Sequence, residues 1–182
     1  MTTRLLITLC GLCLAACSPQ QTPAPTSLIE AAEQGDARQV QRWLSIDPGV
    51  DVRDACQWTP LMKAALHGHL QVLQQLLEAG VQPDLGDKGE YTALMLAASN
   101  NHAKAVRLLI AHGADINHRE NTQGWSALIW AAKQGHMDTV KVLIEAGAET
   151  RFLDRNQRSA QTWAELEQHA EVAAYLAAHP ST

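Results

Sequence analysis

The chain repeats itself every 33 or 34 residues. Three landmarks recur in a fixed order: a Thr or Ser that opens an apolar segment, a pair of alanines, and a Gly-His or Asn-His step. The first landmark stands at Thr59, Thr92 and Ser126, and the alanine pair follows each of them after four intervening residues. Partial copies lie one period earlier and one period later. A period of this length predicts a stack of equivalent units in which each unit contacts only its neighbours.

Each unit reads as two short helices. Apolar residues recur at helical spacing in both segments, and the alanine pair lets a neighbouring helix approach closely. The predicted first helices end at Gly68, Asn101 and Gly135, and the second ones at Gly80, Gly113 and Gly147. Helices this short cannot bury their apolar stripes alone. The sequence therefore predicts an all-α solenoid that is stabilised by stacking.

This pattern resembles the ankyrin repeat over nearly all of residues 27 to 179. The resemblance implies an all-α ankyrin-repeat solenoid of helix-turn-helix units joined by hairpin-like loops. The expected domain is 27–182, with units at 27–54, 55–87, 88–121, 122–154 and 155–179. The chain departs from the family pattern at the His of its Thr-Pro-Leu-His motif, where Met62, Met95 and Ile129 stand.

The turn glycine of the family pattern is kept only at Gly124. Gln57, Glu90 and Gln157 replace it in the other units. A left-handed backbone at a residue with a Cβ atom costs roughly 1 kcal/mol, so we expect these turns to be weaker without a change of fold.

Residues 1–16 are expected to be a lipoprotein signal peptide. Arg4 precedes an apolar run of ten residues, about 15 Å of helix, which is too short to cross a hydrocarbon core of about 30 Å. Leu14-Ala15-Ala16-Cys17 resembles the bacterial lipobox, in which the cysteine sulfur receives a diacylglycerol. An ordinary secretory signal cut after Ala16 is the alternative, but Leu14 is large for the position three residues before that cut.

We therefore expect residues 17–26 to comprise the lipidated Cys17 and a proline-containing flexible linker. Ser18, rather than Asp, follows the cysteine, which favours the periplasmic face of a bacterial outer membrane. In this reading the chain resembles bacterial ankyrin-repeat lipoproteins of the periplasm. The lipid anchor would be its only contact with the membrane.

The charge balance argues against nucleic acid as a partner. Lys and Arg number 14 against 19 Asp and Glu, a net charge of -5, whereas phosphate backbones attract basic surfaces. Cys56 is the only cysteine after Cys17, so no disulfide is expected. We expect a monomer.

The residues that invite a chemical function are few. The sequence contains no nucleophile elbow, His-Glu-x-x-His motif or phosphate-binding loop, so we expect no enzyme activity and no cofactor. His69, His102, His136 and His169 recur with the repeat and are interpreted as structural residues. A metal or small-molecule site using His67, His69 and Cys56 remains an alternative, although no further ligand completes a tetrahedral set.

Aromatic residues occupy one equivalent position before the first helix. Trp58, Tyr91 and Trp125 align there. In ankyrin proteins this position lies on the loop tips at the concave surface, where partners are usually held. The candidate surface continues over the first helices with Lys63, Leu66, His67, Trp130, Lys133 and Gln134. The alternative is that the aromatic rings pack loop against loop between neighbouring units.

These observations predict a non-enzymatic protein–protein interaction module that is tethered in the bacterial envelope. Its concave surface would bind another envelope protein, such as an enzyme or a toxin, and protect, stabilise or inhibit it. The alternative function is that of a periplasmic metal-binding or small-molecule-binding protein.

Overall fold

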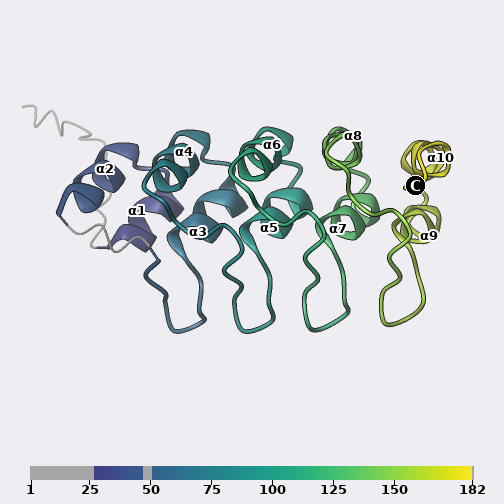
Figure 1. The fold of residues 1–182 in the computed structure, drawn as a ribbon, viewed down its shortest axis with the longest axis horizontal. Helices are drawn as coiled ribbons and strands as arrows, with labels where there is room; N and C mark the ends of the chain where they lie inside the picture. The colour runs from purple at the N-terminus through teal and green to yellow at the C-terminus, as the bar shows by residue number, and fades with distance from the viewer. Residues whose placement is uncertain (1–26, 47–50, 182) are drawn as a thin grey trace, which may run out of the picture.

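The computed structural model describes residues 27–46 and 51–181. The predicted signal peptide, Cys17 and the linker up to residue 26 lie outside this part of the chain. The described residues form ten α-helices and no strand, arranged as five successive pairs (Figure 1). The pairs are α1 (Leu28–Gln34) with α2 (Ala37–Ile46), α3 (Pro60–His67) with α4 (Leu70–Glu78), α5 (Ala93–Ser99) with α6 (Ala103–Ala111), α7 (Ala127–Lys133) with α8 (Met137–Glu145), and α9 (Ala160–Leu166) with α10 (Ala170–Ala178). The predicted all-α solenoid is confirmed.

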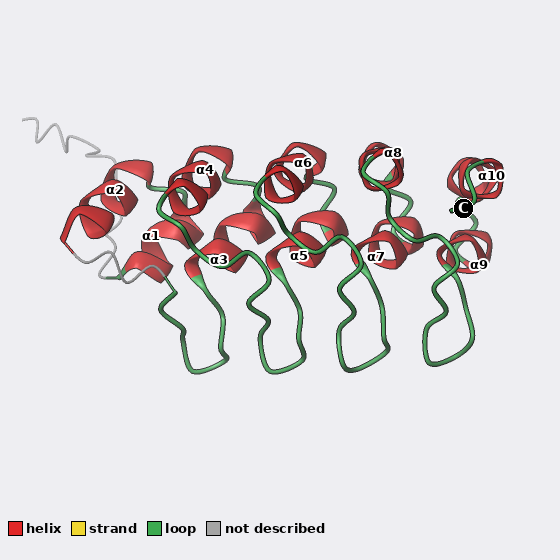
Figure 2. Ribbon diagram, in the orientation of Figure 1, coloured by secondary structure: helices red, strands yellow, loops and turns green. Residues whose placement is uncertain are grey.

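The helices stand in two parallel layers. The first helices of the pairs contact one another in chain order, and the second helices do the same. Figure 2 shows the loops between successive pairs extending from the layer of first helices, away from the layer of second helices. We call these the repeat loops, residues 51–58, 84–91, 117–125 and 150–158. No helix in the described ranges is long and apolar enough to cross a membrane.

Side-chain caps fix where the first helices begin. The hydroxyl of Thr59 accepts a hydrogen bond from the backbone N–H of Met62, and Pro60 occupies the first helical position. Thr92, Ser126 and Ser159 cap α5, α7 and α9 in the same way. Thr or Ser therefore recurs with the period of the repeat because each unit needs this cap.

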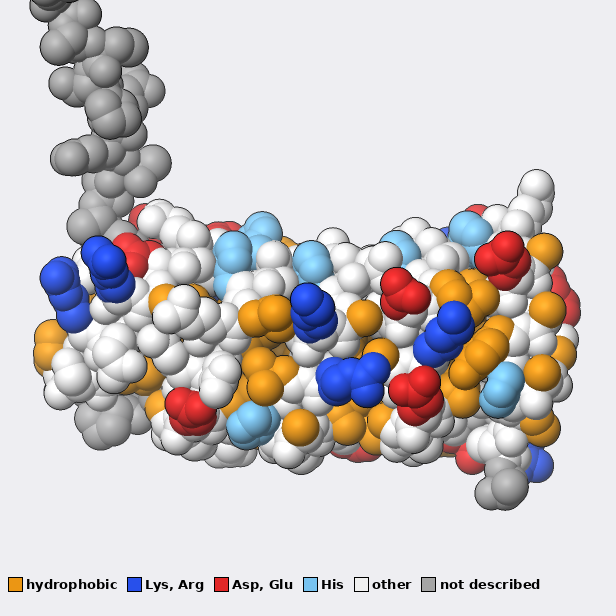
Figure 3. All heavy atoms as spheres, turned by 90° about the horizontal axis from the view of Figure 1, so that it is seen from above, with side chains coloured by type: hydrophobic (Ala, Val, Ile, Leu, Met, Phe, Trp, Pro, Cys, Tyr) orange, Lys and Arg blue, Asp and Glu red, His pale blue; other side chains and the backbone are white. Residues whose placement is uncertain are grey.

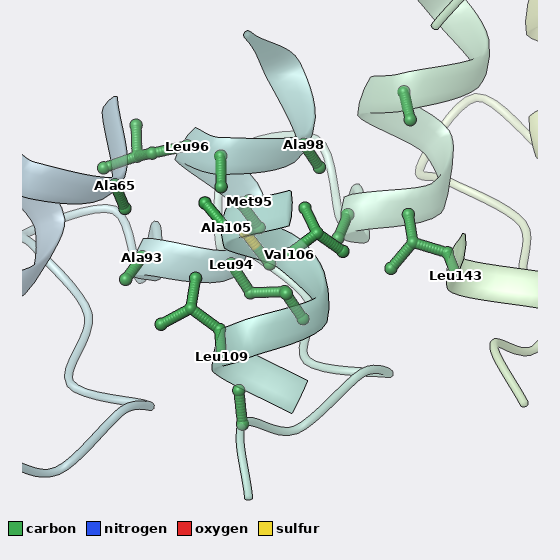
Figure 4. Close-up of a cluster of buried hydrophobic side chains, with 14 of the residues drawn as sticks. Ala65, Ala93, Leu94, Met95, Leu96, Ala98, Ala105, Val106, Leu109 and Leu143 are labelled. Atoms are coloured by element: carbon green, nitrogen blue, oxygen red, sulfur yellow. The ribbon is translucent and has the colours of Figure 1, made fainter. Parts of the chain in front are cut away.

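The core runs through all five units as one cluster. The alanine pairs are fully buried where neighbouring first helices meet, and Figure 4 shows Ala65 and Ala98 among larger aliphatic side chains of the adjoining helices. Met62, Met95 and Ile129 are also buried and belong to this cluster. Apolar packing thus fills the position at which the family pattern has a histidine.

The turns of the repeat loops adopt the left-handed conformation that the sequence predicted. The φ angle is 75° at Gly124 and between 61° and 70° at Gln57, Glu90 and Gln157. Three of these four turns therefore carry a Cβ atom in a region that favours glycine.

Smaller or more polar side chains close the C-terminal end of the stack. At the position of the fully buried Ala132, the last unit carries the exposed Glu165, and at the position of Ile144 it carries the exposed Ala177. Since no further unit follows among the described residues, these changes reduce the apolar surface left open to water.

Candidate functional site

The four periodic histidines connect successive units. In each, Nε2 lies within hydrogen-bond distance of a backbone carbonyl oxygen of the preceding first helix. The pairs are His69 with Glu33, His102 with Leu66, His136 with Ser99, and His169 with Lys133, at 3.0 to 3.1 Å. These contacts agree with the interpretation of the four as structural residues.

The arrangement around His67 and His69 gives the metal alternative no support. Their ring centroids lie 5.6 Å apart, but Nε2 of His69 is engaged with the carbonyl oxygen of Glu33. Cys56 is exposed on a repeat loop. Within residues 27–46 and 51–181, no group of three or more His, Cys, Asp or Glu side chains is arranged to hold a metal ion.

A carboxylate organises each repeat loop from within. One oxygen of Asp54 accepts hydrogen bonds from the backbone N–H groups of Cys56 and Trp58, at 2.8 and 2.9 Å. Asp87 binds the equivalent N–H groups of Gly89 and Tyr91. The sequence showed acidic residues here, but it did not reveal that they hold the residues before each first helix in place.

In the third loop the acid and the last loop residue are five positions apart instead of four, and the acid is longer. Glu120 takes the position of the aspartate and is 2% exposed. Its Oε1 accepts hydrogen bonds from the N–H groups of Gln123 and Trp125, at 2.8 and 2.9 Å, and its other oxygen binds Thr122. The extra methylene of Glu120 thus spans the inserted residue. Burial alone would raise the pKa of Glu120, but the hydrogen bonds from Thr122, Trp125 and Gln123 outweigh it and lower that pKa.

Asp154 holds two tryptophan side chains at once. Its Oδ2 accepts hydrogen bonds from Nε1 of Trp125 and Nε1 of Trp163, both at 2.9 Å. Its Oδ1 binds the N–H groups of Asn156 and Arg158. Burial opposes ionisation, yet the hydrogen bonds from Arg158 and the two indoles lower the pKa of Asp154.

We call the solvent-facing side of the first helices and the adjoining loop ends the inner surface. It carries two rows of equivalent residues. The loop row is Trp58, Tyr91, Trp125 and Arg158, and the helix row is Lys63, Leu96, Trp130 and Trp163. Leu96 and Trp163 were not among the predicted site residues, although the spacing of 33 and 34 residues from Lys63 and Trp130 could have identified them.

Trp125 does not share the exposure of its two equivalents. It is 9% exposed and packs edge-on against Trp130 and Trp163, at centroid distances of 4.6 and 5.2 Å. Because its indole N–H is bound to Asp154, little of this side chain remains for a partner. Trp125 therefore follows the alternative raised above, in which the aromatic rings pack between neighbouring units.

Trp58 and Tyr91 are half-buried. Nζ of Lys63 lies 4.9 Å from the centroid of the Trp58 ring and also pairs with Glu33, at 2.9 Å. The Tyr91 hydroxyl lies 3.1 Å from the hydroxyl of Thr122, and its ring centroid is 6.0 Å from that of Trp130. The structure thus joins Tyr91 and Trp130 across a unit boundary.

The remaining predicted residues lie around these rings. Trp130 is half-buried, and its Nε1 is buried without a hydrogen-bond partner among the described residues. Nζ of Lys133 pairs with Glu167 at 2.7 Å and lies 5.0 Å from the centroid of the Trp163 ring. Leu66 is half-buried, while His67 and Gln134 are exposed.

The opposite side of the molecule has a different character. Figure 3 shows basic, acidic and apolar side chains interspersed over the face seen from above the second helices. Arg107 of α6 pairs with Glu145 of α8 there, at 3.8 Å. The aromatic clustering described above comes from the repeat loops and first helices instead.

Comparison with known proteins identifies the fold family. A family model of ankyrin repeats in three copies matches residues 28–120 and again residues 117–182. A comparison with curated proteins gives no significant match. Ankyrin repeats serve as protein–protein interaction modules and are generally not enzymatic. Since the matched residues make up far more than half of the chain, the protein belongs to the ankyrin repeat family.

Proposed function

We propose that this protein is a lipid-anchored component of the bacterial envelope that binds another envelope protein through its inner surface. Binding would protect, stabilise or inhibit that partner, which could be an enzyme or a toxin. The observation that carries the proposal is the half-exposed pair Tyr91 and Trp130 at the centre of the surface. Tyr and Trp dominate the energetics of protein interfaces because they offer large rigid area at low entropic cost.

The charged residues of the inner surface also support a binding role. Lys63 and Lys133 lie on first helices of the same surface, and each is already paired with a carboxylate of a neighbouring unit. An apolar centre with a polar rim is the usual anatomy of a binding patch.

The proposed location in the bacterial envelope rests on the sequence before the repeats. The apolar run up to Leu14 and the lipobox-like residues ending at Cys17 support export and acylation. Because acyl chains insert into one leaflet, such an anchor would need no membrane-spanning helix.

Metabolic labelling tests the anchor. The full-length wild type should incorporate labelled palmitate and sediment with outer membranes, whereas Cys17→Ser should incorporate none. Cys56→Ser serves as the control and should be labelled like the wild type. Equal labelling of the wild type and Cys17→Ser would rule out lipidation at this residue.

Crosslinking in intact cells tests the binding function. The wild type should capture a specific envelope protein, and Trp130→Ala should capture less of it. Lys104→Ala changes an exposed residue of α6 and should capture as much as the wild type. If both variants capture the same protein in the same amount, the inner surface is not the binding site.

A further inference from the structure

Most aromatic rings of the inner surface are already covered by side chains of the protein itself. Nζ of Lys63 lies over Trp58, and Trp163 has Nζ of Lys133 at 5.0 Å and the guanidinium carbon of Arg158 at 4.9 Å from its centroid. Trp125 is buried. Among the rings of the loop row and the helix row, only Tyr91 and Trp130 combine a half-exposed ring with the absence of a cation over it.

Two lysines of the inner surface are already paired with carboxylates of neighbouring units. Lys63 and Lys133 have 18% and 25% of their side chains exposed, and each contacts a carboxylate oxygen at 2.9 Å or less. A charged partner group placed over the rings would lose water without gaining an unpaired counter-charge from either lysine.

The two rings are also held in a fixed arrangement. Tyr91 is bound through its hydroxyl to Thr122, and Trp130 is braced by the edge-on ring of Trp125. Trp125 in turn is fixed by its hydrogen bond to Asp154. Because the rings are ordered before binding, little conformational entropy is lost when a partner covers them.

We infer that Tyr91 and Trp130 receive an uncharged, apolar segment of the partner protein. One large aliphatic or aromatic side chain of that segment rests against both rings, and its neighbours in sequence carry no charge. This assignment rests on the proposed function, since it specifies the chemistry of the partner at the same surface.

Selection from random peptides tests the assignment without knowledge of the partner. The full-length protein, solubilised in detergent, is exposed to a phage-displayed library of random peptides about a dozen residues long. The selected peptides should share a large apolar residue with uncharged neighbours. Synthetic copies should bind Trp130→Ala at least about tenfold more weakly than the wild type, and Lys104→Ala equally well.

A second variant keeps the test valid if Trp130→Ala folds poorly. Tyr91→Lys changes a half-exposed side chain and introduces a charge, so it should also weaken the selected peptides about tenfold while the circular dichroism spectrum is unchanged. Selection of charged peptides, failure to select any, or unchanged binding by a folded variant would overturn the inference. If crosslinking still captures a partner that depends on Trp130, the proposed function stands and only the apolar segment is wrong.

Discussion

Nε2 of His102 lies 3.1 Å from the carbonyl oxygen of Leu66, across the boundary between two repeats. The ring passes so close to the end of α3 that a Cβ atom on Gly68 would lie 2.7 Å from Nδ1 of His102. Gly68 has a φ angle of 68°. One glycine thus serves two purposes: it ends the helix in the left-handed conformation and leaves room for the histidine of the next unit.

Substitutions at Gly68 and at a second glycine should separate the cost of the collision with His102 from the cost of the left-handed backbone. Gly68→Ala should lower the free energy of unfolding by about 3 kcal/mol, because the methyl group collides with the ring and the left-handed backbone is strained as well. Gly80→Ala is the matched control, since Gly80 has a φ angle of 86° and nothing within 4 Å of its added Cβ. The control should cost only about 1 kcal/mol.

Chemical denaturation of both variants measures the difference. The double variant Gly68→Ala/His102→Ala should lose less stability than the two single variants predict together, because the colliding ring is gone. Equal losses for Gly68→Ala and Gly80→Ala would show that the close approach of His102 has no energetic consequence.

The length of Glu120 should matter as much as its charge. Glu120→Asp shortens the side chain by one methylene, so the carboxylate can no longer reach the N–H groups across the longer loop. We expect a loss of about 1 to 2 kcal/mol in urea denaturation. Deleting one loop residue, Gln123, in the same chain restores the spacing found around Asp54 and Asp87 and should recover part of this loss. No recovery would contradict the proposed match between acid length and loop length.

Low pH should remove the contribution of Glu120 to the stability of the fold. The folded-state pKa of Glu120 is lowered, so its stabilisation is present above the unfolded pKa of about 4.3 and is lost as pH falls through the folded value. The wild type should therefore be more stable than Glu120→Gln at pH 7 by about 1 to 3 kcal/mol, and this difference should shrink below about pH 4. Glu78→Gln, at an exposed position of α4, is the control.

Thermal unfolding between pH 3 and pH 7 checks this dependence. A constant difference between the wild type and Glu120→Gln over this range would exclude the carboxylate of Glu120 as a contributor to acid unfolding.

The repeated pattern was sufficient to predict the fold because each recurring residue has a structural role that every unit needs. Thr59 must cap a helix, Ala64 must fit between helices, and Gly68 must turn the chain and admit a ring. Each requirement recurs with the period, so one sequence contains several independent copies of the evidence. The left-handed turns at Gln57 and Glu90 followed from the same alignment.

The inner surface could be predicted only in part. The exposure of each side chain depends on the side chains of adjacent units, and the alignment of the repeats contains no information on these contacts. Trp58, Tyr91 and Trp125 are equivalent in sequence, but Trp163 of the following unit covers Trp125. The shared acceptor Asp154 lies 29 residues from Trp125, and no local motif connects them. Periodicity therefore locates the row, whereas the side chains of adjacent units decide which of its members face solvent.

The last unit should act as a cap. Deleting residues 155–182 removes α9 and α10 and exposes Leu128 and Leu143, which are now at most 1% exposed. We expect a lower melting temperature and self-association, since the bared face is apolar. Thermal unfolding and size-exclusion chromatography measure the two effects. An unchanged melting temperature with a monomeric elution would show that these helices do not cap the stack.

Two tryptophans that touch each other should give opposite phenotypes. Trp125→Ala removes a buried ring and leaves Oδ2 of Asp154 with one indole donor fewer, so it should cost about 3 to 5 kcal/mol of folding free energy. Trp130→Ala removes a half-exposed ring whose Nε1 has no described partner, so its loss of stability should be smaller. Its main effect should be on partner affinity, by about 2 kcal/mol or more.

The two quantities are measured separately, by denaturation of the free protein and by calorimetry with the captured partner. Trp43→Ala is a useful reference, because Trp43 lies on α2 and packs against the core away from Tyr91 and Trp130 in sequence and unit. It should lower stability and leave the affinity of the folded fraction unchanged. If Trp130→Ala instead resembles Trp43→Ala, with normal affinity and reduced stability, the ring is a structural support and the partner binds elsewhere on the solenoid.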